Sequence, residues 1–178
     1  MKIAIIGYSG SGKSTLARRL GEFYGAEVLH LDAVHFLPGW GERKREDEQA
    51  IVREFLDTRD AWVIEGNYTK LSYERRMEEA DRIVMMTFGR FNCLLRVTRR
   101  YRKYRNTTRP DMAEGCSEKL DAEFVKWVLW KGRRKAQRRR LAGLRERYGD
   151  KTVTLRNQRQ ADAFLEETFR GSGGTGRE

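Results

Sequence analysis

The sequence predicts an α/β fold in which helices cover both faces of a parallel sheet. Short apolar runs, rich in β-branched residues, alternate along the chain with longer segments whose apolar residues recur at helical spacing. That alternation is typical of parallel strands joined by crossover helices, because each strand needs a connection that returns to the same end of the sheet. The chain has 178 residues, a length that suits one domain with a substantial core.

The first half of the chain is expected to supply three strands and three helices. Strands are expected where short apolar runs lead into a polar or glycine residue, at residues 2–6, 27–31 and 61–65. Helices are expected where apolar residues recur every three or four positions, at residues 13–24, 46–58 and 70–80. Residues 33–41 contain Pro38-Gly39 and are expected to form a loop.

The second half is expected to supply two strands and three helices. The strands are residues 82–88 and 152–155. The helices are residues 91–104, residues 117 to about 148, and residues 160–169, with Pro110 in the interruption between the first two. We expect residues 1–170 to form a single domain and the glycine-rich residues 171–178 to form a flexible tail.

A glycine-rich loop with the spacing G-x-x-x-x-G-K-S connects the first strand to the first helix. It reads Gly7-Tyr8-Ser9-Gly10-Ser11-Gly12-Lys13-Ser14-Thr15. Its glycines allow successive backbone N–H groups to turn inward on a polyphosphate, and the following helix directs its positive dipole end at the same charge. Lys13 is expected to reach the β- and γ-phosphates, and the Ser14 hydroxyl to coordinate Mg²⁺. The segment is therefore interpreted as the phosphate-binding loop (P-loop) of a P-loop NTPase, with ATP as the expected ligand.

Two carboxylates follow predicted strands and are expected to lie near the P-loop. Parallel sheets of this kind bind ligands at the carboxyl ends of their strands. Asp32 is expected there to accept a proton from an acceptor hydroxyl or to hold Mg²⁺ through water, and the alternative is a simple turn cap. Glu65 suits the carboxylate that accompanies Mg²⁺ at P-loops, because the fourth strand ends without an acid.

Polar and aromatic residues near these carboxylates are expected to line the pocket for a phosphate acceptor. The loop at residues 33–41 supplies Trp40, and the segment after the third strand supplies Asn67 and Tyr68. Aromatic residues are also common in protein cores, so packing is the alternative role for Trp40 and Tyr68. The two histidines of the chain are expected to serve packing or to face solvent, and no metal is assigned to them.

The net charge of +11 is concentrated in one part of the chain. Residues 90–147 hold 19 Lys and Arg against 6 Asp and Glu. Such a segment either handles phosphate or presents a basic face to nucleic acid or another polyanion. Within it, Arg96, Arg99 and Arg100 share much of one helical face and are the candidates to close over a transferring phosphate. The denser run at residues 131–140 is expected to be a solvated or polyanion-facing surface.

Composition argues against membrane and secreted proteins. No apolar run approaches the ~18 residues that span a bilayer, and the N-terminal apolar run leads into the P-loop instead of a cleavage site. Cys93 and Cys116 lack the spacing of a metal site and are expected to be reduced thiols. We therefore expect a cytoplasmic protein without membrane contact.

With these residues placed, the chain resembles the nucleoside-monophosphate-kinase-like P-loop kinases. Within them it is most similar to the bacterial group labelled "DNA topology modulation protein", which is related to adenylate kinase. The segments that carry the resemblance are GYSGSGKST, LHLDAVHFLPGW, WVIEGNY, RFNCLLRVTRRYRKYR, TRPDMAEGC and FVKWVLW. The P-loop is specific to the superfamily, whereas LHLDAVHFLPGW and TRPDMAEGC are much more specific to the group.

The resemblance implies a three-layer α/β/α sandwich with a five-stranded parallel sheet, the first strand central, and a basic helical lid at about residues 90–147. It also implies that Glu65-Gly66 stands near Mg²⁺, although adenylate-kinase-like enzymes usually carry Asp there. Those enzymes continue with Phe-Pro-Arg, whereas this chain has Asn67-Tyr68, which argues against AMP as the acceptor.

These observations lead to one main hypothesis and two alternatives. The main hypothesis is an ATP- and Mg²⁺-dependent kinase that moves the γ-phosphate to a small acceptor, for example a nucleotide or a nucleoside-like compound. In the first alternative the protein is an ATP-binding, nucleic-acid-associated regulator that affects DNA topology and contacts DNA nonspecifically through residues 90–147. In the second it is a slow ATPase.

Overall fold

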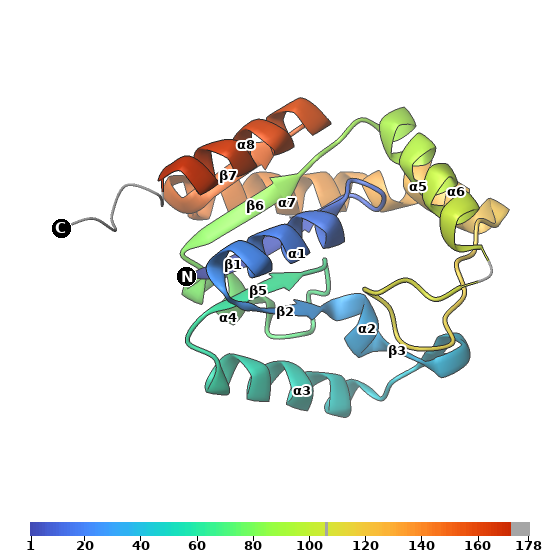
Figure 1. Cartoon of the computed structure of the whole chain (residues 1–178), viewed down its shortest axis with the longest axis horizontal. Helices are drawn as coiled ribbons and strands as arrows, with labels where there is room; N and C mark the ends of the chain where they lie inside the picture. Colours follow the sequence, from blue (N-terminus) through green and yellow to red (C-terminus); the bar gives the residue numbers. More distant parts are fainter. Residues whose placement is uncertain (106, 172–178) are drawn as a thin grey trace.

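The computed structural model describes residues 1–105 and 107–171 and shows an α/β protein built on a five-stranded parallel sheet (Figure 1). The strands lie in the order β2-β5-β1-β6-β7, and every neighbouring pair is parallel. Their bounds are β1 Lys2–Gly7, β2 Glu27–His30, β5 Trp62–Glu65, β6 Arg82–Met86 and β7 Thr152–Leu155. The predicted fold class is confirmed, with the first strand at the centre of the sheet.

Helices cover both faces of the sheet, and each face has its own core. Alternate residues of β1 enter opposite cores, Ile3 and Ile5 on one face and Ala4 and Ile6 on the other. The helices of the first core are α1 (Lys13–Tyr24), α5 (Arg90–Tyr104), α6 (Ala122–Leu129) and α8 (Gln158–Gly171). Those of the second are α2 (Leu31–His35), α3 (Arg45–Thr58), α4 (Tyr73–Glu79) and α7 (Lys135–Arg147). Burial on both faces explains why the strands read as continuous apolar runs.

The segment after β2 is more regular than the sequence suggests, and the prediction of a loop at residues 33–41 was wrong. Leu31 begins α2 instead of ending the strand, and Asp32 lies in the first turn of that helix, where a negative charge is favourable. The chain then forms a small antiparallel hairpin from β3 (Phe36–Leu37) and β4 (Gly41–Glu42). The turn between them is a short 3₁₀ segment, Pro38–Trp40.

The prediction of one long helix from residue 117 to about 148 was also wrong. The chain forms α6, a 3₁₀ turn at Lys131–Arg133, and then α7. Helix α6 ends at Leu129, and Gly132 lies in the 3₁₀ turn that follows, where an added Cβ would lie 3.0 Å from the indole Nε1 of Trp127. This turn therefore packs closely against Trp127 of α6, at a position where glycine leaves room for the indole. Beyond the break, Leu141 and Leu144 pack into the second core, which makes α7 part of the domain body.

Beyond α7, the described chain continues through β7 to α8. A third 3₁₀ turn, Gly149–Lys151, leads into β7. Of the predicted tail at residues 171–178, Gly171 is the last residue of α8 and the rest lies outside the described residues. Within the described part of the chain, no helix is both long and apolar enough to span a bilayer.

The connection between α5 and α6 crosses one end of the molecule. Residues 107–121 contain an isolated bridge between Thr108 and Ser117 and carry no helix. Figure 1 shows this stretch, in yellow, running from the α5–α6 pair toward the β3 hairpin. We call residues 107–121 the crossing segment.

Candidate active site

The P-loop has a backbone that requires glycine. Gly10 and Gly12 have φ values of 78° and 98°, in the left-handed region that side chains disfavour. An added Cβ at Gly10 would lie 2.7 Å from the Cys93 carbonyl oxygen and from Val97 Cγ1. Helix α5 therefore packs directly on the loop and fixes its shape. The first helical residue is Lys13, so the N–H groups at the start of α1 belong to the loop.

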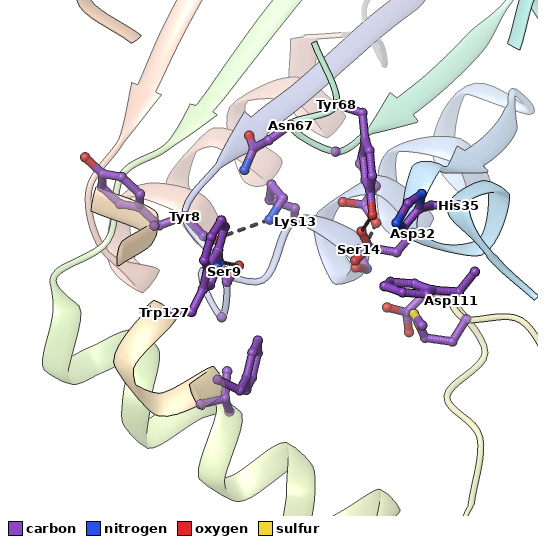
Figure 2. Close-up of a pocket in the computed structure, with 18 of the residues that line it drawn as sticks. Tyr8, Ser9, Lys13, Ser14, Asp32, His35, Asn67, Tyr68, Asp111 and Trp127 are labelled. Atoms are coloured by element: carbon purple, nitrogen blue, oxygen red, sulfur yellow. Dashed lines mark hydrogen bonds between the residues drawn. The ribbon is translucent and has the colours of Figure 1, made fainter. Parts of the chain in front are cut away.

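Lys13 and Ser14 occupy the middle of the site. In Figure 2, Lys13 lies between Tyr8 and Ser14, and its Nζ donates to the Tyr8 carbonyl oxygen at 3.3 Å. The Ser14 hydroxyl donates to Glu65 Oε1 at 2.9 Å. The structure thus brings the predicted lysine, serine and strand-end glutamate together.

Glu65 is a buried carboxylate, only 3% exposed, and it carries a negative charge. Its Oε1 also lies 3.0 Å from His30 Nδ1. Burial by itself would raise the pKa of Glu65, but the His30 contact, the charge of Lys13 and the Ser14 hydroxyl hold that pKa below its ordinary value. His30 was expected to be a packing or solvent residue; the structure places it beside the strand-end carboxylate.

The oxygen donors at this point fit Mg²⁺ that arrives with a nucleotide. Ser14 and Glu65 supply a hydroxyl and a carboxylate, and Mg²⁺ is usually held by one or two such groups together with substrate phosphates and water. Across the described residues there is no cluster of three or more His, Cys, Asp or Glu side chains that could hold a metal alone.

Asp32 and Tyr68 form a hydrogen-bonded pair on the other side of Ser14 (Figure 2). The Tyr68 hydroxyl donates to Asp32 Oδ1 at 2.8 Å. Burial and the charge of Asp32 raise the pKa of Tyr68, so the phenol keeps its proton and remains a donor. The second oxygen of Asp32 has no hydrogen-bond partner within the described residues. Asp32 is therefore an oriented carboxylate with one oxygen available to a ligand.

Aromatic side chains surround this pair. The rings of His35 and Tyr68 are 5.1 Å apart, and the rings of Phe36 and Trp40 are 5.1 Å apart in an edge-to-face arrangement. His35 is fixed from behind by Glu48, whose Oε1 lies 2.6 Å from its Nδ1. This wall comes from α2 and from the β3–β4 hairpin, so Trp40 lies on the side of the pocket that was predicted to receive an acceptor.

Asn67 and Arg76 hold the segment that follows β5. Both ends of the Asn67 amide bond to the backbone of Gly7, at 2.6 and 3.0 Å, and so fasten the P-loop to this segment. Arg76 is fully buried and donates to the carbonyl oxygens of Leu71, Tyr68 and Gly66, at 2.8, 2.6 and 3.4 Å. The two bonds to Gly7 give Asn67 a positioning role at the P-loop.

The three predicted lid arginines have different surroundings. Arg96 reaches the P-loop, where its guanidinium lies against Gly12, and its Nη1 donates to Gln158 Oε1 at 2.6 Å. Arg99 is exposed and has no ion-pair partner within the described residues. Arg100 donates to Glu118 Oε1 through Nε and Nη2, at 3.0 and 2.6 Å.

Several residues of the site were not predicted. Arg109, Asp111 and Glu118 form a buried ion-pair cluster in the crossing segment. At the opposite end, Trp127 Nε1 donates to Ser9 Oγ at 3.2 Å, and the Arg133 guanidinium lies 4.0 Å from the centre of the Tyr8 ring. The TRPDMAEGC segment, which carries the family resemblance, was the available signal for the first cluster.

A cavity of about 1090 Å³ connects these parts. Of the predicted site residues, all except Gly7 and Ser11 line it, and the three arginines of α5 line it together with Asp32, Trp40 and Tyr68. Ser11 is fully buried, and its hydroxyl has no hydrogen-bond partner within the described residues. The P-loop and the oriented carboxylate therefore open into one space large enough for a nucleotide and a small second substrate.

Comparison with solved structures identifies kinases with this fold. A shikimate kinase from Acinetobacter baumannii, in complex with shikimate, is 18% identical with a TM-score of 0.55, and the match covers 99% of this chain and 95% of that one. A gluconokinase from Sinorhizobium meliloti 1021 is 18% identical with a TM-score of 0.54, covering 99% and 97%. A deoxyadenosine kinase from M. mycoides is 12% identical with a TM-score of 0.51, covering 97% and 99%.

At these identities the likeness shows the fold and not the activity. No protein-family model matches the sequence, and no curated protein matches it.

Proposed function

We propose that this protein is a kinase that transfers the γ-phosphate of ATP to a hydroxyl group on a small acceptor. The observation that carries the proposal is the shared cavity, into which the P-loop and the Asp32 carboxylate both open. Asp32 is oriented by the Tyr68 hydroxyl at 2.8 Å and keeps one oxygen available. A P-loop alone would serve hydrolysis equally well, whereas an oriented base inside an aromatic-walled pocket suits a second substrate.

The residues suggest how the transfer would proceed. Lys13 and the loop N–H groups bind the β- and γ-phosphates, and Ser14 and Glu65 would hold Mg²⁺, which when bound neutralises phosphate charge. The acceptor oxygen attacks the γ-phosphorus, and its proton passes to the free oxygen of Asp32. The bond from the γ-phosphorus to its bridging oxygen breaks, and ADP leaves with that electron pair. The exposed guanidinium of Arg99 is free to neutralise charge on the transferring group.

The names of the similar structures support the reaction class. Shikimate kinase, gluconokinase and deoxyadenosine kinase all act on small molecules by name. The matches cover nearly the whole of this chain. Which acceptor this chain uses is set by the pocket around Asp32, Trp40 and Tyr68.

A second candidate is contact with a polyanion through the outer face of α7. Arg138, Arg139 and Arg145 are exposed there and have no ion-pair partner within the described residues, whereas Arg147 pairs with Glu74. This face would support nonspecific, salt-sensitive binding to DNA, as in the regulator hypothesis.

The decisive experiment measures ADP release from ATP and Mg²⁺ against a panel of nucleoside monophosphates, nucleosides, sugars and small hydroxy acids. We expect one class to stimulate release strongly and Lys13→Ala to lower that rate by at least about 10². Arg19→Ala, which removes a positive charge from the same helix outside the cavity, is the control and should retain the rate. Slow release that no acceptor stimulates would overturn the kinase proposal, and stimulation by double-stranded DNA alone would favour the regulator.

A further inference from the structure

A chain of four charged side chains runs from α5 through the crossing segment. Glu118 accepts from Arg100 at 3.0 and 2.6 Å through Oε1, and its Oε2 lies 2.5 Å from Arg109 Nε. Arg109 Nη1 donates to Asp111 Oδ2 at 2.8 Å. The side chains of Arg109, Glu118 and Asp111 are 9%, 3% and 10% exposed. Positive and negative groups alternate, so each buried charge between Arg100 and Asp111 has an opposite neighbour.

The last member of the chain stands at the P-loop. Figure 2 shows Asp111 on the crossing segment, close to Ser14 and on the side of the pocket that holds Asp32. Asp111 Oδ2 is held by the Arg109 guanidinium, and Asp111 and Ser14 line the same cavity. The ion pair with Arg109 makes Asp111 a carboxylate anion, close to the same hydroxyl that bonds to Glu65.

Two buried carboxylates next to a polyphosphate site are electrostatically costly unless a cation joins them. The P-loop is built to receive several negative charges, and Asp111 and Glu65 add two more at its serine. Arg109 already shares its charge between Asp111 and Glu118, so it neutralises Asp111 only in part. A divalent cation placed among the phosphates, Ser14 and both carboxylates would turn this repulsion into attraction.

We propose that Asp111 is a metal-site residue, which supplies a second carboxylate, beside Glu65, for the Mg²⁺ that enters with the nucleotide. The inference rests on the nucleotide-binding part of the proposed function and holds equally for a kinase or an ATPase. Arg109 and Glu118 are then positioning residues. Asp111 is then the residue by which the crossing segment takes part in the metal site.

Contacts on the far side of the crossing segment support this role, because they fix where Asp111 can lie. Trp40 Nε1 donates to the Ser117 carbonyl oxygen at 3.1 Å, and Cys116 Sγ donates to the Leu37 carbonyl oxygen at 3.3 Å. The segment is therefore held between the β3–β4 hairpin and Arg100 of α5.

The test compares ADP binding with and without Mg²⁺ by calorimetry, using wild type, Asp111→Asn and the control Glu114→Gln. Glu114 is an exposed acid three residues further along the same segment, so the control removes the same charge away from the site. We expect Mg²⁺ to tighten ADP binding to wild type and to the control. In Asp111→Asn that enhancement should fall by about 10- to 100-fold, while metal-free ADP binds as in wild type or more tightly.

A second readout follows the metal directly. Free Mn²⁺, measured by its electron paramagnetic resonance signal, should be taken up by wild type with ADP and much more weakly by Asp111→Asn with ADP. If Asp111→Asn does not fold, as judged by circular dichroism, Asp111→Ser is measured in its place.

Two outcomes would overturn the inference. One is an unchanged Mg²⁺ enhancement in a folded variant. The other is an equal loss of ADP affinity with and without metal, which would make Asp111 a purely structural partner of Arg109. Because ADP needs no acceptor, these results remain distinct from the acceptor panel: loss of the enhancement together with no phosphate transfer would uphold the metal assignment and reject the kinase.

Discussion

At the scale of single residues, the pair formed by Asp32 and Tyr68 determines what the site can do. A carboxylate in the first turn of α2 is stabilised by the helix dipole, and a neutral phenol fixes one of its oxygens. The remaining oxygen is therefore presented in one direction, toward the cavity that the P-loop also lines. Such a group needs little reorganisation to accept a proton from a bound hydroxyl.

This arrangement predicts different effects for substitutions of the two partners. Asp32→Asn should lower kcat by about 10²–10⁴ and leave ADP affinity unchanged, because it removes the proton acceptor without touching the P-loop. Tyr68→Phe should lower kcat by about 10-fold, since the base is retained but loses its orienting bond. Phosphate transfer to the acceptor found in the panel, together with ADP calorimetry, measures both. A loss of ADP affinity in Asp32→Asn that matched the loss of kcat would contradict the assignment.

Site residues were predictable where a short local pattern in the sequence determines their position. The P-loop spacing places Lys13 and Ser14, and the ends of apolar runs place Asp32 and Glu65. Asp111 was not predictable in this way. It reaches Ser14 only because the crossing segment returns from α5 to the sheet edge, and no local pattern encodes that approach.

At the scale of elements, the segment between β5 and α4 is held by one buried cation. Arg76 on α4 satisfies three backbone carbonyl oxygens, and burial lowers its pKa to about 10. The side chain therefore remains charged at neutral pH. Above about pH 10 the native Arg76 begins to lose its proton, whereas the unfolded chain keeps that proton up to the ordinary pKa of arginine. Burial of the charged side chain therefore destabilises the native state fully below pH 10, and this destabilisation is relieved as the pH rises above 10.

Removing this cation should destabilise the protein despite that penalty. Arg76→Met leaves up to three buried carbonyl oxygens without their partner, and we expect it to lower the free energy of unfolding by about 2–5 kcal/mol. Arg75→Met is the matched control, because Arg75 lies on the same helix with a 37% exposed side chain paired to Asp57 and Glu79. It should cost about 1 kcal/mol or less. Urea unfolding measures both free energies. Equal decreases in the two variants would show that the hydrogen bonds to the carbonyl oxygens do not cause the destabilisation.

Elements were predicted well where burial gives a periodic pattern and poorly where a single contact decides. The strands and the helices on both faces follow from apolar periodicity. In the 3₁₀ turn after α6, Gly132 packs against Trp127, a contact that a window of helical propensity does not register. The start of α2 at Leu31 was missed because a helix of five residues has too few turns to show a period.

At the scale of the whole molecule, the cavity has a nucleotide side and an acceptor side that share the crossing segment. One edge of that segment carries Asp111 toward Ser14, and the other bonds to the hairpin through Ser117 and Cys116. Because the strands are parallel, both sides lie at one edge of the sheet. The alternation of predicted strands and helices and the family resemblance both predicted this parallel sheet. The link between the sides was not predictable, because it joins residues about 80 positions apart.

These hydrogen bonds predict that nucleotide binding also stabilises the β3–β4 hairpin, on the acceptor side of the cavity. When Mg²⁺ and ADP order Asp111, amide hydrogen exchange should slow both in residues 107–121 and in the hairpin at residues 36–42, because the two are hydrogen-bonded.

Trp40 adopts a φ of 69°, uncommon for a bulky side chain, and its bond to Ser117 helps to hold that conformation. Trp40→Phe removes the indole donor but leaves the Cys116–Leu37 bond, so it should weaken the protection of the hairpin while leaving that of residues 107–121 unchanged. Trp130→Phe, which alters an exposed tryptophan away from the cavity, should change neither. Protection confined to residues 107–121 in the wild type would mean that the two sides of the pocket bind their substrates independently.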